Sequence, residues 1–172
     1  MVTSQRSDFI AKEYDLKTYT VYNGLNIGAS QADFWRLLVL YRYGGVYMDI
    51  DAHLVCPMCL IIKPHFQELY IKIKSGEISN YFIASKPNNP NTKLLIDKSI
   101  DNIWNMRSEN VYSLTGPGVF NEIFAELNVP TRYYLYTCNQ GNFTNEYFQY
   151  VDKRQGKWTR EQERTKLINK TW

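Results

Sequence analysis

Residues 29–51 read ASQADFWRLLVLYRYGGVYMDID and carry the strongest structural signal in the chain. In the first half, apolar residues recur at helical spacing and predict a helix capped by Ser30, whose apolar face is formed by Phe34, Leu37, Leu38 and Tyr41. Gly44 and Gly45 favour the end of this helix, because glycine tolerates the positive φ found at helix ends. From 46 to 52 the pattern changes to period two, which is typical of a strand. The stretch therefore predicts a helix that folds back beside a strand.

Two acidic residues, Asp49 and Asp51, come at the end of the expected strand. They share one face with Tyr47, while Val46, Met48 and Ile50 share the other face. Carboxylate oxygens that converge on one point suit a hard cation such as Mg²⁺ or Mn²⁺, which leaves its other positions to water and phosphate. Such a cation would hold the diphosphate of a nucleotide sugar and stabilise the leaving group. The Asp-x-Asp pattern alone is common in proteins and not specific.

The expected helix adds a carboxylate and a guanidinium group. Asp33 and Arg36 lie three positions apart, hence on neighbouring parts of the helix surface. Since the double glycine folds this helix back beside the strand, both side chains are expected to reach the edge that carries Asp49 and Asp51. An ordinary exposed ion pair on a helix is the alternative reading of the two residues.

The whole stretch from Ala29 to Asp51 closely resembles the sugar-binding region of glycosyltransferases with a DXD motif. That group includes the yeast-type initiating mannosyltransferases and the α-1,4-galactosyltransferases of glycosyltransferase family 32 and, more distantly, the large clostridial glucosylating toxins. The resemblance continues through NYFIASKPNNP at 80–90 and TGPG at 115–118. It implies a GT-A fold, a Rossmann-like mixed α/β sheet flanked by helices, with Mn²⁺ (or Mg²⁺) as cofactor and transfer with retention of anomeric configuration.

Matched position by position, the resemblance assigns Asp33 and Arg36 to the donor sugar, Asp49 to the ribose and sugar hydroxyls, and Asp51 to the metal. Asn80 is expected to face the donor site by the same resemblance. The implied partners are a UDP- or GDP-hexose donor and a saccharide or lipid-linked acceptor.

Further donor contacts are expected from the later motifs. Gly116, within the turn 115–118, is expected to present backbone N–H groups to substrate at the start of a helix, although a plain turn explains the glycines as well. Trp172, like Trp158, is a candidate to stack on the sugar or nucleotide, with packing of the last helix as the alternative.

The chain departs from the family pattern at both ends. Only about thirty residues precede the helix, roughly one minimal βαβ unit, so part of the N-terminal nucleotide-binding half is expected to be missing. The histidine with which the family often completes the metal site near the C-terminus is absent, and Asn145, Glu146 and Asp152 stay open as substitutes.

Elsewhere the sequence predicts interleaved helices and strands without linkers or repeats, hence a single α/β domain over residues 1–172. Helices are expected at 7–14, 91–106 and 119–127, strands at 17–22, 81–85 and 132–138, and a last polar helix at a capping box of Thr159 and Gln162.

Charge and composition narrow the function class. With 20 basic and 17 acidic residues, the net charge of +3 is too small for a protein that binds nucleic acid electrostatically. No stretch reaches the ~20 apolar residues of a membrane span, and basic residues near the C-terminus suit either a solvated helix face or peripheral contact with an anionic membrane. Three cysteines do not form a disulfide framework, so we expect a cytoplasmic protein, at the inner face of the membrane if it binds one.

The first hypothesis is therefore a retaining, cation-dependent hexosyltransferase of bacterial surface-polysaccharide biosynthesis. The second is a catalytically incomplete glycosyltransferase remnant that binds a sugar or a protein. A metal-dependent phosphotransferase or nuclease is disfavoured, because such sites commonly use more acidic ligands to hold two metals.

Overall fold

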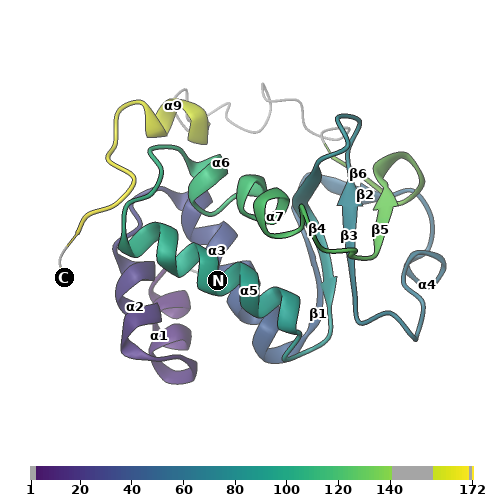
Figure 1. Cartoon of the computed structure of the whole chain (residues 1–172), viewed down its shortest axis with the longest axis horizontal. Coiled ribbons are helices and arrows are strands. Elements are labelled where there is room, and N and C mark those ends of the chain that lie inside the picture. The colour runs from purple at the N-terminus through teal and green to yellow at the C-terminus, as the bar shows by residue number, and fades with distance from the viewer. Residues whose placement is uncertain (1–2, 141–156, 171) are drawn as a thin grey trace.

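The structure, a computed structural model, describes residues 3–140, 157–170 and 172. Most of its helices gather at one end of the molecule, while its strands and the short helix α4 lie at the other (Figure 1). The helical elements are α1 (Thr3–Glu13), α2 (Leu16–Asn23), α3 (Gly28–Tyr43), α4 (Met58–Ile61), α5 (Pro90–Trp104), α6 (Val111–Leu114), α7 (Pro117–Ile123), the 3-10 turn η1 (Tyr134–Tyr136) and α9 (Trp158–Gln162). Among the described residues, no helix is both long and apolar enough to cross a membrane.

The strands form one mixed sheet and one short ribbon. They are β1 (Gly45–Met48), β2 (Ala52–Leu54), β3 (Glu68–Lys72), β4 (Ile78–Ser85), β5 (Thr131–Tyr133) and β6 (Cys138–Gln140). The sheet has the order β1-β4-β3-β5, in which β3 and β5 are parallel and the other pairs antiparallel, and β2 pairs with β6 antiparallel. The predicted fold class, a mixed α/β sheet flanked by helices, is confirmed.

Successive side chains of a strand point to opposite faces of the sheet, and an apolar core covers each face. Tyr70 of β3 and Ile83 of β4 belong to the larger apolar core, which they share with α2, α3, α5 and α7. Their neighbours Leu69 and Phe82 belong to a second core on the opposite face. Helix α3 packs against α5, β1 and β4, so it is held in place directly beside the central strands.

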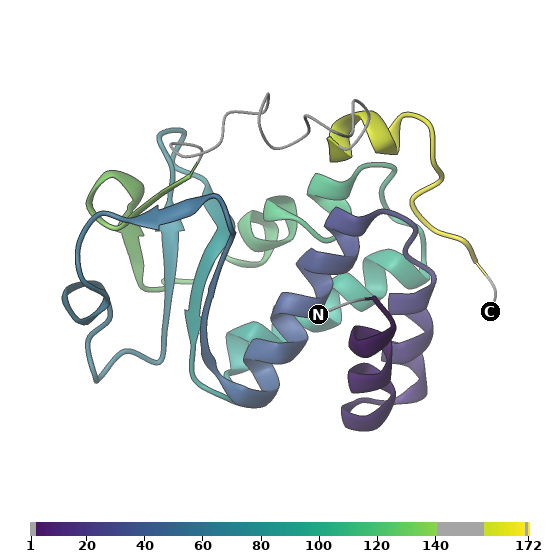
Figure 2. The same cartoon turned by 180° about the vertical axis from the view of Figure 1, so that it is seen from behind.

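The predicted helix is α3, but Ser30 does not cap it: the N-cap is Ile27, and Ser30 Oγ donates to the Ile27 carbonyl at 2.8 Å. The connection from α3 to β1 follows the double glycine, as predicted. Gly44 has φ 66° and Gly45 has φ 110°, conformations that glycine adopts without the steric cost paid by other residues. Seen from behind, α3 runs down to this turn and β1 returns beside it (Figure 2).

The predicted strand at 17–22 is wrong, because this segment is helix α2. Asp15 caps it, with Oδ1 accepting a hydrogen bond from the Thr18 N–H at 2.7 Å, and Val21 and Tyr22 are buried in the core. Capping and burial outweigh the weak strand propensity of Thr, Tyr and Val.

The strand predicted at 46–52 is shorter than expected, since β1 ends at Met48. Its alternating apolar face does not pack into a core: Val46 is 41% exposed, Met48 37% and Ile50 102%. Tyr47, on the other face, packs against the larger core and is the side chain that anchors β1 to the helical layer.

Two C-terminal predictions also need correction. The strand predicted at 132–138 is three elements, β5, η1 and β6. The capping box of Thr159 and Gln162 does not form, because the N-cap of α9 is Lys157, with no side-chain cap bond; instead Gln162 Oε1 accepts from the Val111 N–H at 3.1 Å, where α6 begins. The helices predicted at 7–14, 91–106 and 119–127 and the strand at 81–85 are confirmed as α1, α5, α7 and β4, with shifted ends.

Candidate active site

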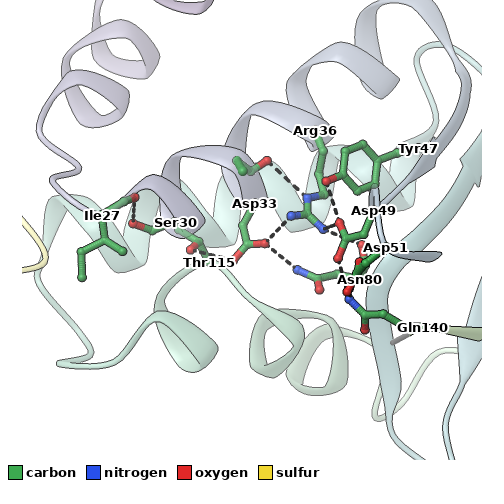
Figure 3. Close-up of polar contacts among 11 residues, drawn as sticks. Ile27, Ser30, Asp33, Arg36, Tyr47, Asp49, Asp51, Asn80, Thr115 and Gln140 are labelled. Atoms are coloured by element: carbon green, nitrogen blue, oxygen red, sulfur yellow. Dashed lines mark hydrogen bonds and ion pairs between the residues drawn. The ribbon is translucent and has the colours of Figure 1, made fainter. Parts of the chain in front are cut away.

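Arg36 is the centre of a buried polar network between α3 and β4 (Figure 3). Its side chain is almost fully buried, with Nη2 2.8 Å from Asp33 Oδ1 and Nη1 3.3 Å from Asp49 Oδ1. Nη1 also donates to the backbone carbonyl of Asn80 at 2.7 Å, and Nε to that of Ala32 at 3.3 Å. Because a guanidinium has a rigid, planar set of donors, these contacts fix Asp49 relative to the helix.

Asp33 connects three segments of the chain. Its carboxylate accepts hydrogen bonds from Asn80 Nδ2 at 2.9 Å and from Thr115 Oγ1 at 3.4 Å, in addition to the ion pair with Arg36. Burial raises the pKa of Asp33 from 3.8 to about 6, although the positive charge of Arg36 acts in the opposite direction. The carboxylate thus holds α3, β4 and the segment before α7 together.

Tyr47 contacts both Asp49 and Arg36 (Figure 3). Its hydroxyl donates to Asp49 Oδ1 at 2.7 Å, and its ring lies 4.2 Å from the guanidinium carbon of Arg36. Burial raises the pKa of Asp49, while Arg36 and the Tyr47 hydrogen bond lower it. The sequence placed Tyr47 on the same strand face as Asp49 but gave no sign of this supporting role.

The two acidic residues converge although the strand ends before them. Asp49 follows β1 directly, with its N–H bonded to the Tyr81 carbonyl at 2.8 Å and its own carbonyl accepting from the Ala52 N–H at 3.0 Å, and this turn brings Asp51 alongside. Gln140 Nε2 donates to Asp49 Oδ2 at 3.0 Å and to Asp51 Oδ1 at 3.3 Å. Oxygens of both carboxylates therefore face a single point.

These groups border a pocket of about 260 Å³. Its polar wall consists of Asp33, Arg36, Asp49, Asn80 and Gln140, and its aromatic wall includes Tyr81, Tyr112 and Trp158. Of the predicted site residues, the structure therefore brings Asp33, Arg36, Asp49 and Asn80 to one pocket, with Asp51 joined to its edge through Gln140. Trp158 lines the pocket and also packs against the larger core, so both of its expected roles stay open.

Trp172 and Gly116 are placed differently from the expectation. Trp172 stacks on Trp104, with ring centroids 5.4 Å apart, and lies against Gly24, away from the residues that line the pocket. The N–H of Gly116 donates to the Val111 carbonyl at 3.0 Å, so it is not presented to a substrate. A Cβ at Gly116 would come within 3.0 Å of Tyr112, so close packing of α6 on α7 explains this glycine.

The predicted substitutes for a third metal ligand, Asn145, Glu146 and Asp152, lie outside the described residues. Within the described part of the chain, no group of three or more His, Cys, Asp or Glu side chains could hold a metal ion. Gln140, which sequence reasoning missed, is the polar side chain that meets both acidic residues.

The structure combines a mixed α/β domain with an acidic pair at a strand end and a buried acid–guanidinium pair beside it. Residues 1–72 match the model of the glycosyltransferase sugar-binding region containing a DXD motif. The matched part includes α3 and both acidic residues. The resemblance to DXD glycosyltransferases is thereby confirmed, while the narrower assignment to mannosyl- or galactosyltransferases stays a prediction.

Two similar proteins extend this finding beyond the DXD region. Over 154 residues the chain is 29% identical to an uncharacterised glycosyltransferase of Acanthamoeba polyphaga mimivirus, a match that covers 80% of this chain and 59% of that protein. The structure resembles the PaToxG glycosyltransferase with a TM-score of 0.56 and 26% identity, over 70% of this chain and 43% of that one. The chain thus spans less than two thirds of either protein.

Proposed function

We propose that this chain transfers a hexose from a nucleotide-sugar donor to a saccharide or lipid-linked acceptor, with a divalent cation bound by Asp49 and Asp51. The observation that carries the proposal is the convergence of these two carboxylates on one point, beside the pocket that contains Asp33 and Arg36. The match to the DXD sugar-binding region supports it, since that match spans the same residues.

The residues fit a hard cation. The N–H group of the Gln140 amide contacts an oxygen of each carboxylate. A divalent cation also prefers a position between carboxylate oxygens. A bound Mn²⁺ or Mg²⁺ would supply charge stabilisation for the diphosphate leaving group. Asp49 Oδ1 is already occupied by Arg36 and Tyr47, so Oδ2 is the atom of Asp49 that is turned toward the cation position.

The pocket itself suits a sugar. Asn80 offers a polar side chain for hydroxyl groups, and the rings of Tyr112 and Trp158 line the same pocket, where a sugar ring could pack against them. The proposal assigns this pocket of about 260 Å³ to the hexose of the donor.

Retention of configuration is part of the proposal. Asp33 is committed to Arg36, Asn80 and Thr115, and Asp49 to Arg36 and Tyr47, so neither carboxylate is placed as a free nucleophile. The acceptor proton would then pass to the phosphate of the donor itself, as the family resemblance implies. The donor base, UDP or GDP, and a cytoplasmic role in bacterial surface polysaccharide stay predictions.

The test is donor hydrolysis and transfer in Mn²⁺ with a panel of UDP- and GDP-hexoses. Asp51→Ala is expected to lower turnover by at least about a hundredfold, because it removes a ligand of the cation that stabilises the diphosphate leaving group. Asp97→Ala is the matched control, because Asp97 is 53% exposed on α5 and pairs with Lys93. Equal turnover of wild type and Asp51→Ala would reject the site.

A second candidate is a sugar-binding module without turnover. It is favoured by the volume of the pocket, about 260 Å³, which lies below the ~300–1,000 Å³ of most small-molecule sites. Calorimetry with the same panel separates the two: donor binding in Mn²⁺ without hydrolysis or transfer to any acceptor tested favours the module.

A further inference from the structure

Gln140 is held beside the acidic pair by backbone pairing. It is the last residue of β6, and in the β2–β6 ribbon its Cα partner is Ala52, the residue that follows Asp51. This register places the Gln140 side chain next to the turn that carries Asp49 and Asp51 (Figure 3). The position is therefore set by the fold and not by chance contact of a long surface side chain.

Gln140 contacts one oxygen of each acidic residue, Asp49 Oδ2 and Asp51 Oδ1. Asp49 Oδ1 is held by Arg36 at 3.3 Å and by the Tyr47 hydroxyl at 2.7 Å. Asp49 Oδ2 and Asp51 Oδ1 instead accept from Gln140 Nε2, at 3.0 Å and 3.3 Å. A cation shared by the two carboxylates would thus lie next to the Gln140 amide.

A glutamine amide has a nitrogen and an oxygen on the same carbon, and a half-turn about its terminal bond exchanges their positions. Gln140 is exposed, so packing does not oppose this turn. Hard cations accept amide carbonyl oxygens as ligands together with carboxylates. The described residues contain no third His, Cys, Asp or Glu at this point.

We infer that Gln140 is a protein ligand of the cation. A half-turn of the amide directs Oε1 toward the cation, in place of the N–H group that contacts Asp49 and Asp51. This inference rests on the proposed function, because it takes the acidic pair as the cation site. It assigns the role of third ligand to a residue of β6.

The experiment is calorimetric titration of the full chain with Mn²⁺ alone, in the absence of donor. Gln140→Ala is expected to weaken Mn²⁺ binding by about tenfold or more, in line with the ~10–100-fold that even outer partners of metal ligands contribute. Gln140→Glu is expected to restore binding and tighten it, because a carboxylate oxygen replaces the amide oxygen. If Gln140→Ala binds Mn²⁺ as tightly as wild type, or more tightly, the amide only competes with the cation and the inference is overturned.

Gln67 provides the matched control. It is an exposed glutamine whose amide donates to the His65 carbonyl at 3.5 Å, away from the acidic pair. Gln67→Ala and Gln67→Glu carry the same changes in size and charge and are expected to alter Mn²⁺ affinity by less than about twofold, as exposed charges are screened. An equal gain in affinity from both Glu variants would show a general charge effect and contradict coordination by residue 140.

Asp51→Ala separates failure of the inference from failure of the proposed function. If Mn²⁺ binding requires Asp51 but ignores Gln140→Ala, the inference about Gln140 alone fails. If wild type binds no Mn²⁺, the cation site and the inference fail together. Circular dichroism and thermal unfolding without metal check that each variant is folded, and Gln140→Glu keeps the test valid should Gln140→Ala be unfolded.

Discussion

The candidate site has two halves with opposite surroundings. In the buried half, Asp33 and Arg36 are 7% and 5% exposed, and Asn80 and Thr115 complete their hydrogen bonds inside the protein. In the outer half, Asp49 and Asp51 meet an exposed glutamine at the mouth of the pocket. This contrast separates two roles. The buried half fixes the position of Asp49, and the outer half is where the proposal puts the cation.

Replacing Arg36 in the buried half is expected to have the largest effect on stability. Arg36→Met leaves Asp33 buried without its counter-charge and is expected to lower the free energy of unfolding by about 3–5 kcal/mol. Arg42→Met is the control on the same helix, since Arg42 is 53% exposed and its pair with Glu13 contributes at most about 1 kcal/mol. Urea denaturation measures both, and similar small losses in the two variants would contradict a structural role for Arg36.

Asp33 links stability to pH. Its pKa is raised to about 6 in the folded state, so the folded state binds the proton over a range in which the unfolded chain has released it. The contribution of this group to stability is thus fully present below about pH 4 and lost as the pH rises through about 6. Relative to wild type, Asp33→Asn should gain roughly 2–3 kcal/mol between pH 4 and pH 7, from ~1.4 kcal/mol per pKa unit.

The measurement is chemical denaturation of both proteins at a series of pH values. The Asn side chain keeps the shape of Asp33, so the constant part of the stability difference cancels and only its pH dependence is compared. A difference that stays flat from pH 4 to pH 7, or one of opposite sign, would contradict the raised pKa.

Tyr47 lies between the two halves and should have an intermediate effect. Tyr47→Phe removes the hydrogen bond to Asp49 but keeps the ring beside Arg36, and is expected to cost about 0.5–1.5 kcal/mol. Tyr112→Phe removes a hydroxyl bonded to Glu77 at the surface and should cost less. Thermal unfolding checks the order of the two, and a larger loss for Tyr112→Phe contradicts it.

Asp51 should have the smallest effect on stability. Asp51→Asn replaces a carboxylate at the outer edge of the site, where substitutions usually change stability by no more than about 0.5 kcal/mol. The same variant is expected to lose Mn²⁺ binding measured by titration. A destabilisation comparable to that of Arg36→Met would remove the distinction between the two halves.

The sequence allowed prediction of the parts of the site that lie within one contiguous stretch. Helix α3, the glycine turn and the acidic pair all lie within 28–51. Here the spacing of apolar residues predicts the helix, and the two glycines predict its end. The strand prediction at 17–22 failed because the cap at Asp15 and burial of Tyr22 outweigh propensity.

The remaining parts depend on contacts between distant segments. Gln140 lies 89 positions after Asp51 and is brought to it by the β2–β6 pairing, which no local sequence pattern predicts. Trp158 and Trp172 look alike in sequence, but one lines the pocket and the other stacks on Trp104. The register of strands and the packing of the C-terminal segment decide such cases.

Calorimetric titration of wild type and Asp51→Ala with UDP- and GDP-hexoses, with and without Mn²⁺, measures whether the acidic pair binds the donor through a cation. We expect wild type to bind one donor class in Mn²⁺, and binding to weaken by at least about tenfold, ~1.4 kcal/mol, when either Mn²⁺ or the Asp51 carboxylate is removed. Donor binding that is equally tight without Mn²⁺ and in Asp51→Ala, or that is absent from a folded wild type, would contradict this expectation.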